Sequence, residues 1–285
     1  MTKHPAPGRL LALVTATALE MRAALAGLPA EPADGGLRHE AAVTARRHAD
    51  ASTDQAGYAV PERGAALARI AGRDVLLVVT GVGPVNAALE MGAVLGRYGL
   101  SGALNLGLAG SFDLIAAPLE SAVAATRETY PEYGVVGPSD SDGLADASSF
   151  PFPQWKDAAG GVLQSLELSP DDAAAAMGLV LPESAKRGVA LTVAGVTGSF
   201  GRAEAMATRH GALTESMEGF ALALACRTRQ VPFLEVRTIS NRVGERDRAN
   251  WKLKQALEGL GSALAGLFPA QAPQTNRDQP DKTTS

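Results

Sequence analysis

The chain has 285 residues, of which 46% are hydrophobic and 20% are charged, and its formal net charge is −4 at pH 7. This balance predicts a globular protein with a sizeable core, in one large domain or two small ones. The negative charge, without any basic tract, gives no electrostatic case for a nucleic-acid partner. A single cysteine, Cys226, excludes an internal disulfide framework and is compatible with a reducing compartment, so we expect a cytoplasmic protein.

The first predicted element is a buried strand. Residues 1–9 are expected to be a flexible start. The basic N-terminus followed by "LLALVTATAL" faintly resembles a secretory signal, but the apolar run is short and Glu20 follows it at once. We therefore favour a strand at Leu10–Val14 and a helix from about Leu19 to Leu28. No stretch of the chain approaches the roughly 18–20 apolar residues that a membrane span requires.

Farther along, apolar runs of strand length alternate with amphipathic segments. Strands are expected at Val75–Thr80, Ala103–Leu108, Val123–Thr126 and Phe233–Ile239, and buried apolar residues return at Gly188–Val196. Helices are expected at Pro84–Tyr98, at Arg202–His210, through "TESMEGFALALACRTRQ", which would bury Cys226 as a small core residue, and at Trp251–Phe268. Irregular connections are expected at 29–66 and 134–160, and disorder at 269–285.

This alternation predicts an α/β sandwich with a largely parallel sheet. In such sheets, ligands bind beyond the carboxyl ends of the strands. The polar residues that follow the predicted strands are therefore site candidates, joined by two further short segments. These candidates are Thr15–Glu20, Gly81–Asn86, Gly107–Phe112 and Ser240–Arg242, with Thr197–Ser199 and Met217–Glu218.

Each motif has a plain structural alternative. "GVGPVNAA" fits a phosphate-cradling turn or a tight strand-to-helix turn, and no Gly-Lys-Ser follows it as in a nucleotide P-loop. Glu20 and Glu218 both lie where helices begin, a favourable place for any carboxylate. Glu218 has apolar neighbours, however, which favours a functional role. The four histidines lack metal-ligand spacing, so we expect no metal, and no Gly-x-Ser-x-Gly elbow is present.

Five segments together resemble the nucleoside phosphorylase and nucleosidase superfamily: "VTATALEM", "TGVGPVNAA", "NLGLAGSF", "ESMEGFALALAC" and "VRTISNRVGERDRANW". The resemblance covers about residues 10–268 and implies a single nucleosidase domain, a three-layer α/β/α sandwich with a central mixed, largely parallel sheet. Within the superfamily the sequence is most similar to the futalosine hydrolases, on "TALE" and "ISNRVGERDRANWK". These enzymes cleave futalosine to hypoxanthine and dehypoxanthine futalosine in the alternative route to menaquinone. The resemblance implies no cofactor, a nucleoside substrate, and a homodimer or larger homo-oligomer.

The resemblance also implies roles for individual residues. Glu20 matches the glutamate with which nucleosidases activate water, and the pair Met217 and Glu218 matches the residues that hold the ribose. Asn241 falls where adenine-specific nucleosidases usually carry an aspartate that protonates the purine at N7. The purine-binding set would be Ala109, Gly110, Val196, Thr197 and Asn241, with Arg237 and Ser240 as supporting residues.

The amide of Asn241 limits the chemistry at the base. It cannot release a proton at working pH, but its NH₂ group can donate to N7 and O6 of hypoxanthine. An asparagine can also pair with adenine, so Asn241 alone does not choose the base. Glu20, if ionised, can orient a water molecule and accept its proton, which contributes about 10²–10⁴ in rate.

Three other functions stay open: a general purine nucleosidase of the methylthioadenosine/S-adenosylhomocysteine type, a purine nucleoside phosphorylase, and a nucleoside-binding protein without turnover. The charge of Glu20 would repel phosphate, which favours water, although Arg22 and Arg73 lie nearby in the sequence. An aromatic cluster in the 134–160 loop is either a local hydrophobic plug or a wall for the futalosine tail, whose carboxylate has three candidate partners. The cluster is Phe150, Phe152 and Trp155, and the candidate partners are Arg242, Arg246 and Arg248.

Overall fold

The structure is a computed structural model, which describes residues 10–28, 52–53, 58–137, 144–148, 150–158 and 160–268. The flexible start expected at 1–9 and the disordered tail expected at 269–285 lie outside the described residues. The same holds for residues 29–51 and 54–57 of the connection expected at 29–66.

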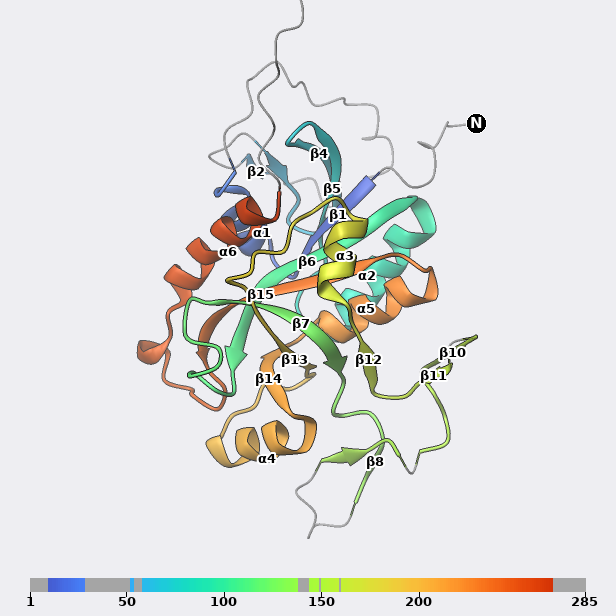
Figure 1. Cartoon of the computed structure of the whole chain (residues 1–285), viewed down its shortest axis with the longest axis vertical. Coiled ribbons are helices and arrows are strands. Elements are labelled where there is room, and N and C mark those ends of the chain that lie inside the picture. Colours follow the sequence, from blue (N-terminus) through green and yellow to red (C-terminus); the bar gives the residue numbers. More distant parts are fainter. Residues whose placement is uncertain are drawn as a thin grey trace, which may run out of the picture.

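Within the described part of the chain, nine strands form one mixed sheet (Figure 1). Its order is β12 (Ser165–Glu167), β7 (Ala122–Thr129), β13 (Lys186–Thr192), β14 (Ala212–Ser216), β6 (Leu100–Ser111), β1 (Leu10–Thr15), β5 (Arg73–Val79) and β4 (Gly64–Ile70), while β15 (Phe233–Arg242) pairs with β6 and β7. β1 runs parallel to β5 and β6, β13 to β7 and β14, and β15 to β6. The edge strands β4 and β12 are antiparallel to their neighbours, and β14 is antiparallel to β6.

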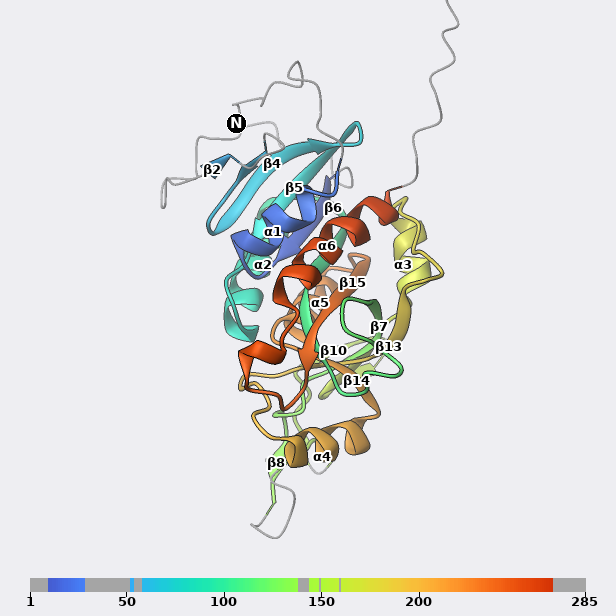
Figure 2. The ribbon, with the colours of Figure 1, turned by 90° about the vertical axis from the view of Figure 1, so that its left-hand side faces the viewer.

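Six α-helices accompany the sheet in the described residues. They are α1 (Ala18–Leu25), α2 (Pro84–Arg97), α3 (Pro170–Ala176), α4 (Phe200–His210), α5 (Gly219–Thr228) and α6 (Leu253–Leu267). Figure 2 shows α1 and α6 side by side over the face of the sheet that is turned toward the viewer. Short two-stranded pairs lie outside the main sheet: β2 (Ser52–Thr53) with β3 (Ala59–Val60), β8 (Val135–Val136) with β9 (Ala145–Asp146), and β10 (Trp155–Asp157) with β11 (Gly160–Val162).

The alternating side chains of β1 explain the three layers. Successive residues of a strand point to opposite faces of its sheet. Leu11 and Leu13 belong to the core that contains residues of α1, α3 and α6, whereas Ala12 and Val14 belong to the core that contains residues of α2 and α5. Every residue of β1 is buried, as expected for a central strand covered on both sides. The predicted α/β/α sandwich with a mixed, largely parallel sheet is confirmed.

The prediction was wrong at the segment "TESMEGFALALACRTRQ". Its first residues are not helical: Ala212–Ser216 forms β14, and α5 begins only at Gly219. β14 lies between β13 and β6, where its backbone completes the hydrogen bonding of both neighbours. Pairing with distant strands thus overrode the local helix preference of the acidic residues, which a sequence pattern alone does not reveal. α3 and the short strands in the 134–160 loop were also not predicted.

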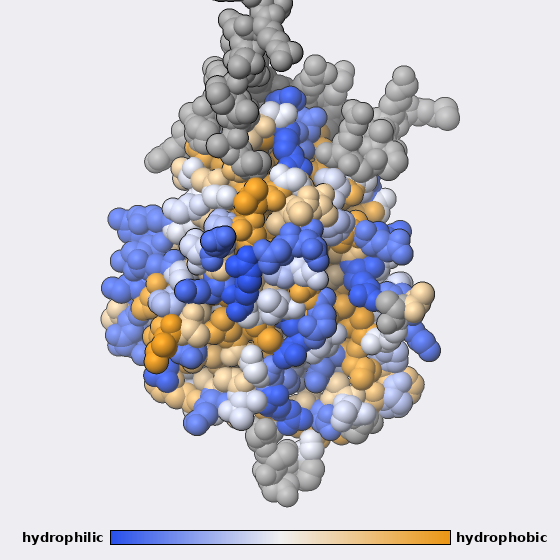
Figure 3. All heavy atoms as spheres, in the orientation of Figure 1, coloured by the Kyte–Doolittle hydropathy of each residue, from blue (hydrophilic) through white to orange (hydrophobic). Residues whose placement is uncertain are grey.

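The single cysteine lies in the core. Cys226 is fully buried in α5, where burial raises the pKa of its thiol to about 12, in agreement with its predicted role as a small core residue. Hydrophilic and hydrophobic residues are interspersed over the face shown in Figure 3. Among the described residues, no helix combines the length and the apolar character that a bilayer crossing needs.

Candidate active site

A cavity of about 220 Å³ opens where β1, β6, β14 and β15 end. Of the ten residues that the sequence singled out, nine line this cavity. They are Glu20, Ala109, Gly110, Val196, Thr197, Met217, Glu218, Ser240 and Asn241. The tenth, Arg237, is buried behind Glu218 and does not line the cavity. Two carboxylates and one carboxamide that are up to 221 positions apart in the chain, from Glu20 to Asn241, therefore share one cavity.

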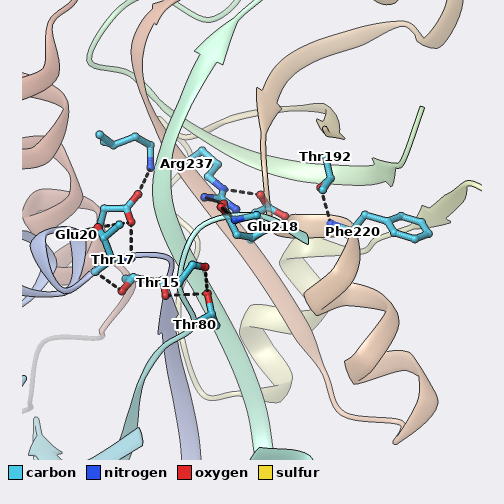
Figure 4. Close-up of polar contacts among 12 residues, drawn as sticks. Thr15, Thr17, Glu20, Thr80, Thr192, Glu218, Phe220 and Arg237 are labelled. Carbon is cyan, nitrogen blue, oxygen red and sulfur yellow. Dashed lines mark hydrogen bonds and ion pairs between the residues drawn. The ribbon is translucent and has the colours of Figure 1, made fainter. Parts of the chain in front are cut away.

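Glu20 is held at the start of α1 by a capping box (Figure 4). Its Oε2 atom accepts hydrogen bonds from the backbone N–H of Thr17 at 3.0 Å and from the Thr17 hydroxyl at 2.8 Å. Its Oε1 atom accepts from the backbone N–H of Leu108 at 3.1 Å. A carboxylate offers about four acceptor positions, so one remains for a molecule in the cavity.

Glu218 is the N-cap residue of α5, but its side chain makes no capping hydrogen bond and lies beside Arg237 instead (Figure 4). Its Oε1 atom accepts a hydrogen bond from the backbone N–H of Gly83 at 3.0 Å, and its Oε2 atom lies 3.5 Å from Nη1 of Arg237. Gly83 has a φ of +96°, a left-handed conformation that glycine adopts without strain. Burial raises the pKa of the Glu218 carboxyl, while Arg237 and the Gly83 N–H oppose that shift.

A chain of buried polar groups continues behind Glu218. Arg237 is 2% exposed, and its Nε atom donates to Oε1 of Glu235 at 2.6 Å. Oε2 of Glu128 accepts a hydrogen bond from the Thr192 hydroxyl at 2.8 Å, whereas Oε1 of Glu128 and Oε2 of Glu235 are buried without a hydrogen-bond donor among the described residues. A Cβ atom at Gly219 would lie about 2 Å from an oxygen of each carboxyl group, at 2.1 Å from Glu128 and 2.2 Å from Glu235, so only glycine fits there.

The carboxyl groups of Glu128 and Glu235 lie next to each other in the interior. Burial, followed by the negative charge of Glu235, raises the pKa of Glu128 well above its ordinary value. The neutral form of the Glu128 carboxyl group is therefore favoured relative to a carboxyl group in water. Arg237 forms ion pairs with Glu218 at 3.5 Å and with Glu235 at 2.6 Å.

Asn241 is oriented by its neighbours in β15. Its Oδ1 atom accepts a hydrogen bond from the Ser240 hydroxyl at 2.8 Å, and its Nδ2 atom donates to the carbonyl of Arg242 at 2.9 Å. The second N–H of the amide is left for a ligand. Ser240 therefore fixes which end of the amide is the donor.

The sequence prediction missed Glu215, although this residue also lines the cavity. Its carboxylate accepts from the backbone N–H of Thr197 at 3.0 Å and from the Thr197 hydroxyl at 2.5 Å. Glu215 is 8% exposed, and burial raises the pKa of its carboxyl, while the hydrogen bonds from Thr197 oppose the shift. It was missed because its segment was predicted to be the start of a helix. The alternation of side chains in the strand "ALTES" was the only available signal.

The aromatic residues of the 134–160 loop pack on one another. The ring of Phe150 meets those of Tyr133 and Phe152 edge-on, each with ring centroids 5.4 Å apart. Neither Phe150, Phe152 nor Trp155 is among the described residues that line the cavity. Phe152 and Trp155 remain 65% and 37% exposed, so the cluster lies at the surface, outside the cavity. Of the three arginines considered for that tail, only Arg246 lines the cavity, where its guanidinium lies 5.8 Å from the centre of the Trp251 ring.

The fold is that of the phosphorylase superfamily, as comparisons with known proteins show. A family model described as the phosphorylase superfamily matches residues 35–267. The chain is 36% identical over 199 residues to a futalosine hydrolase of Streptomyces coelicolor, covering 68% of this chain and 78% of that protein. It is 33% identical over 201 residues to a futalosine hydrolase of Thermus thermophilus, covering 69% of this chain and 82% of that protein. The crystal structure of a futalosine hydrolase of Helicobacter pylori superposes with a TM-score of 0.61 at 15% identity, covering 91% of this chain and 95% of that chain.

The structural likeness, at this low identity, shows the shared fold alone. The sequence relatives go further, because they exceed 30% identity over most of their own length. The chain belongs to the phosphorylase superfamily and, within it, to the futalosine hydrolases.

Proposed function

We propose that the protein hydrolyses the N-glycosidic bond of futalosine and releases hypoxanthine and dehypoxanthine futalosine. One observation carries this proposal: Glu20, Glu218 and Asn241 line a single cavity at the ends of central strands. The futalosine hydrolases of Streptomyces coelicolor and Thermus thermophilus, which are similar in sequence, support the choice of substrate. By this reaction the protein would act in the alternative route to menaquinone.

In the proposed mechanism, Glu20 supplies the general base. Its one remaining acceptor position binds the attacking water, and its carboxylate takes the water's proton as the oxygen bonds to C1′ of the ribose. The partners that hold Glu20, Thr17 and Leu108, keep the carboxylate fixed while the water reacts. The bond between C1′ and N9 breaks, and its electron pair leaves with the base.

Glu218 acts on the sugar. As the C1′–N9 bond breaks, the ribose ring gains positive charge, and a carboxylate bound to the ribose hydroxyls stabilises that charge. The N–H of Gly83 and the guanidinium of Arg237 hold this carboxylate in place before the substrate arrives. Met217, which also lines the cavity, would pack against the ribose.

Asn241 stabilises the departing base by hydrogen bonding. Its free N–H donates to N7 or O6 of hypoxanthine, where electron density collects as the bond breaks. Asn241 cannot donate a proton, so the proton that neutralises the base comes from solvent water.

Water is favoured over phosphate by the charges around the cavity. Glu20 and Glu218 place negative groups where a phosphate would have to bind. Arg246 is the single cation among the described residues of the lining. Arg22, one of two arginines considered for phosphate, forms an ion pair with Glu62 at 3.0 Å and does not line the cavity.

The test is an assay with futalosine in phosphate-free buffer, with hypoxanthine measured by chromatography. The proposal expects release without phosphate, and loss of release in Glu20→Gln and Glu218→Gln. Cleavage of inosine or methylthioadenosine but not of futalosine would instead indicate a general purine nucleosidase. A requirement for phosphate, with a ribose-1-phosphate product, would indicate a phosphorylase, and binding without any turnover would indicate a nucleoside-binding protein.

We also propose that the protein acts in the cytoplasm as a homodimer or larger homo-oligomer. Val85 and Leu89 lie four residues apart on one face of α2, and their exposures of 71% and 65% leave a hydrophobic strip uncovered in the single chain. Val82, which precedes this helix, lines the cavity. Sedimentation of the wild type and of Val85→Glu tests the proposal, which expects an oligomer that the charged variant weakens.

A further inference from the structure

We propose that Arg246 binds the carboxylate of the futalosine tail at the mouth of the cavity, and so selects nucleosides that carry a negative charge far from the glycosidic bond. This inference rests on the proposed function and adds the residue that recognises the charged end of the substrate. Hypoxanthine and ribose are neutral, so the tail carboxylate is the one anionic group that futalosine brings to the cavity.

The charges of the cavity lining differ in sign with depth. Four carboxylates line the cavity, and Arg246 is the single cation among the described lining residues; the carboxylates are Glu20, Glu215, Glu218 and Glu245. Glu20, Glu215 and Glu218 are buried, whereas Arg246 is exposed. The guanidinium therefore lies nearer to solvent than the carboxylates that act on water and sugar. A substrate group that meets it lies at the mouth.

The segment that carries Arg246 is held in place by hydrogen bonds. The N–H of Lys252 donates to the carbonyl of Ser240 at 2.8 Å, which ties the end of the segment to β15. The indole N–H of Trp251 donates to the carbonyl of Glu245 at 3.2 Å. The guanidinium of Arg246 lies 5.8 Å from the centre of that fixed ring, within the range of a cation–π contact. Holding the side chain in advance lowers the entropy cost of binding an anion.

The acidic neighbours of Arg246 are occupied elsewhere. The carboxylate of Glu245 accepts from the N–H of Asp247 at 2.7 Å and from the amide of Asn250 at 2.9 Å, and Asp247 accepts a backbone N–H at 2.9 Å. Within the described part of the chain, the Arg246 side chain forms no ion pair and no hydrogen bond. Its charge reaches the cavity, where it opposes the rise that burial causes in the pKa of Glu215. The N–H donors of the guanidinium are therefore left for a carboxylate, which they can bind in pairs.

The experiment compares futalosine with its methyl ester, which lacks the negative charge, in phosphate-free buffer. The wild type should favour the acid in kcat/KM by about tenfold, because the ester loses a charge-assisted hydrogen bond. In Arg246→Gln this preference should disappear, through slower cleavage of the acid alone. Arg248→Gln removes an exposed arginine of the same segment that does not line the cavity, so it should keep the preference. An equal loss for both compounds in Arg246→Gln, or a preference that persists there, overturns the inference.

A measurement on the wild type needs no variant. Salt screens an interaction between exposed charges, so raising the salt concentration should reduce the preference for the acid severalfold and leave the cleavage of the ester unchanged. A preference for the acid that does not depend on salt overturns the inference.

Phosphate is the other anion that a guanidinium binds well, so inosine 5′-phosphate is assayed beside futalosine. Faster cleavage of inosine 5′-phosphate overturns the assignment to a carboxylate. If neither futalosine nor its ester is cleaved, the proposed function fails, and calorimetry with the same two compounds decides the role of Arg246. Tighter binding of the acid that is lost in Arg246→Gln supports that role, and equal binding of acid and ester overturns it.

Discussion

The carboxylates of Glu20 and Glu218 share one cavity but are held in opposite ways. Glu20 is fixed chiefly by Thr17, three residues before it, in a motif that belongs to the first turn of α1. Glu218 is fixed by residues far away in the chain, Gly83 and Arg237, and Arg237 in turn depends on Glu235. The first turn of α1 is therefore enough to position Glu20. The position of Glu218, by contrast, requires a correctly folded sheet.

The Glu218 region must also manage buried charge. Arg237, Glu235 and Glu128 are 2%, 0% and 0% exposed, and moving charges out of water is costly unless they are paired. Arg237 contacts both Glu218 and Glu235, and the raised pKa of Glu128 favours the neutral form of the third carboxyl group. A third anion would face the low-dielectric interior without a partner. The difference between the two regions is therefore that Glu20 is held by a local helix cap, whereas Glu218 is held by Arg237, whose other partner is the buried carboxyl group of Glu235.

The largest expected effect comes from Glu20→Gln. Glutamine can still occupy the capping position, but it cannot accept the proton of water, so turnover should fall by about 10²–10⁴ while the substrate still binds. Steady-state kinetics together with binding measured by calorimetry would separate the two quantities. Near-normal turnover in this variant would show that Glu20 is not the general base of the reaction.

The next effect tests whether the buried carboxyl group of Glu128 is neutral, as its raised pKa favours. Glu128→Ala removes a buried hydrogen-bonding group and leaves Thr192 and Glu235 without their partner, so the free energy of unfolding should fall by about 2–4 kcal/mol. Glu128→Gln is the matched control, because its amide can accept from Thr192 and donate to Glu235, as protonated glutamic acid does. It should stay within about 1 kcal/mol of the wild type in denaturant unfolding. A glutamine variant as unstable as the alanine variant would contradict a protonated Glu128.

The same contrast explains how much of the molecule was predictable from the sequence. The central strands and Glu20 follow from local signals, namely apolar runs and a Thr-x-x-Glu cap. Glu218 and Asn241 were reached through the resemblance to a known superfamily. Glu128 and Glu235 have no local signal, because each lies in an apolar strand and acquires its partner only when β7 and β15 come together.

Glu215 shows the remaining difficulty. Its segment contains acidic residues followed by a strongly apolar run, a pattern typical of a helix start. Only the pairing of β14 with β13 and β6 reveals that it is a strand and directs Glu215 to the cavity. Information of this kind lies in tertiary contacts rather than in the order of neighbouring residues.

A smaller effect is the pH dependence of stability that Glu128 introduces. Since the folded state raises the pKa of Glu128 above 4.5, the folded protein binds more protons than the unfolded chain between the two pKa values. The free energy of unfolding therefore falls as pH rises through that window, by at most about 1.4 kcal/mol per pH unit from this group. Glu128→Gln lacks this proton, so its stability relative to the wild type should increase from pH 5 upward. Denaturant unfolding of both proteins at several pH values measures the difference, and parallel pH profiles would contradict the assignment.

The smallest expected effect concerns the helix cap that Thr17 forms with Glu20. Thr17→Ala removes the hydroxyl that caps α1 and that donates to Glu20, so the free energy of unfolding should fall by about 0.5–2 kcal/mol. Turnover should fall only severalfold, because the backbone N–H groups of Thr17 and Leu108 still hold the Glu20 carboxylate. Thr17→Ser keeps the hydroxyl and should restore both quantities, measured by denaturant unfolding and steady-state kinetics. If Thr17→Ala lost as much turnover as Glu20→Gln, the Glu20 region would depend on its hydroxyl donor as strictly as Glu218 depends on Arg237, and the contrast between the two regions would fail.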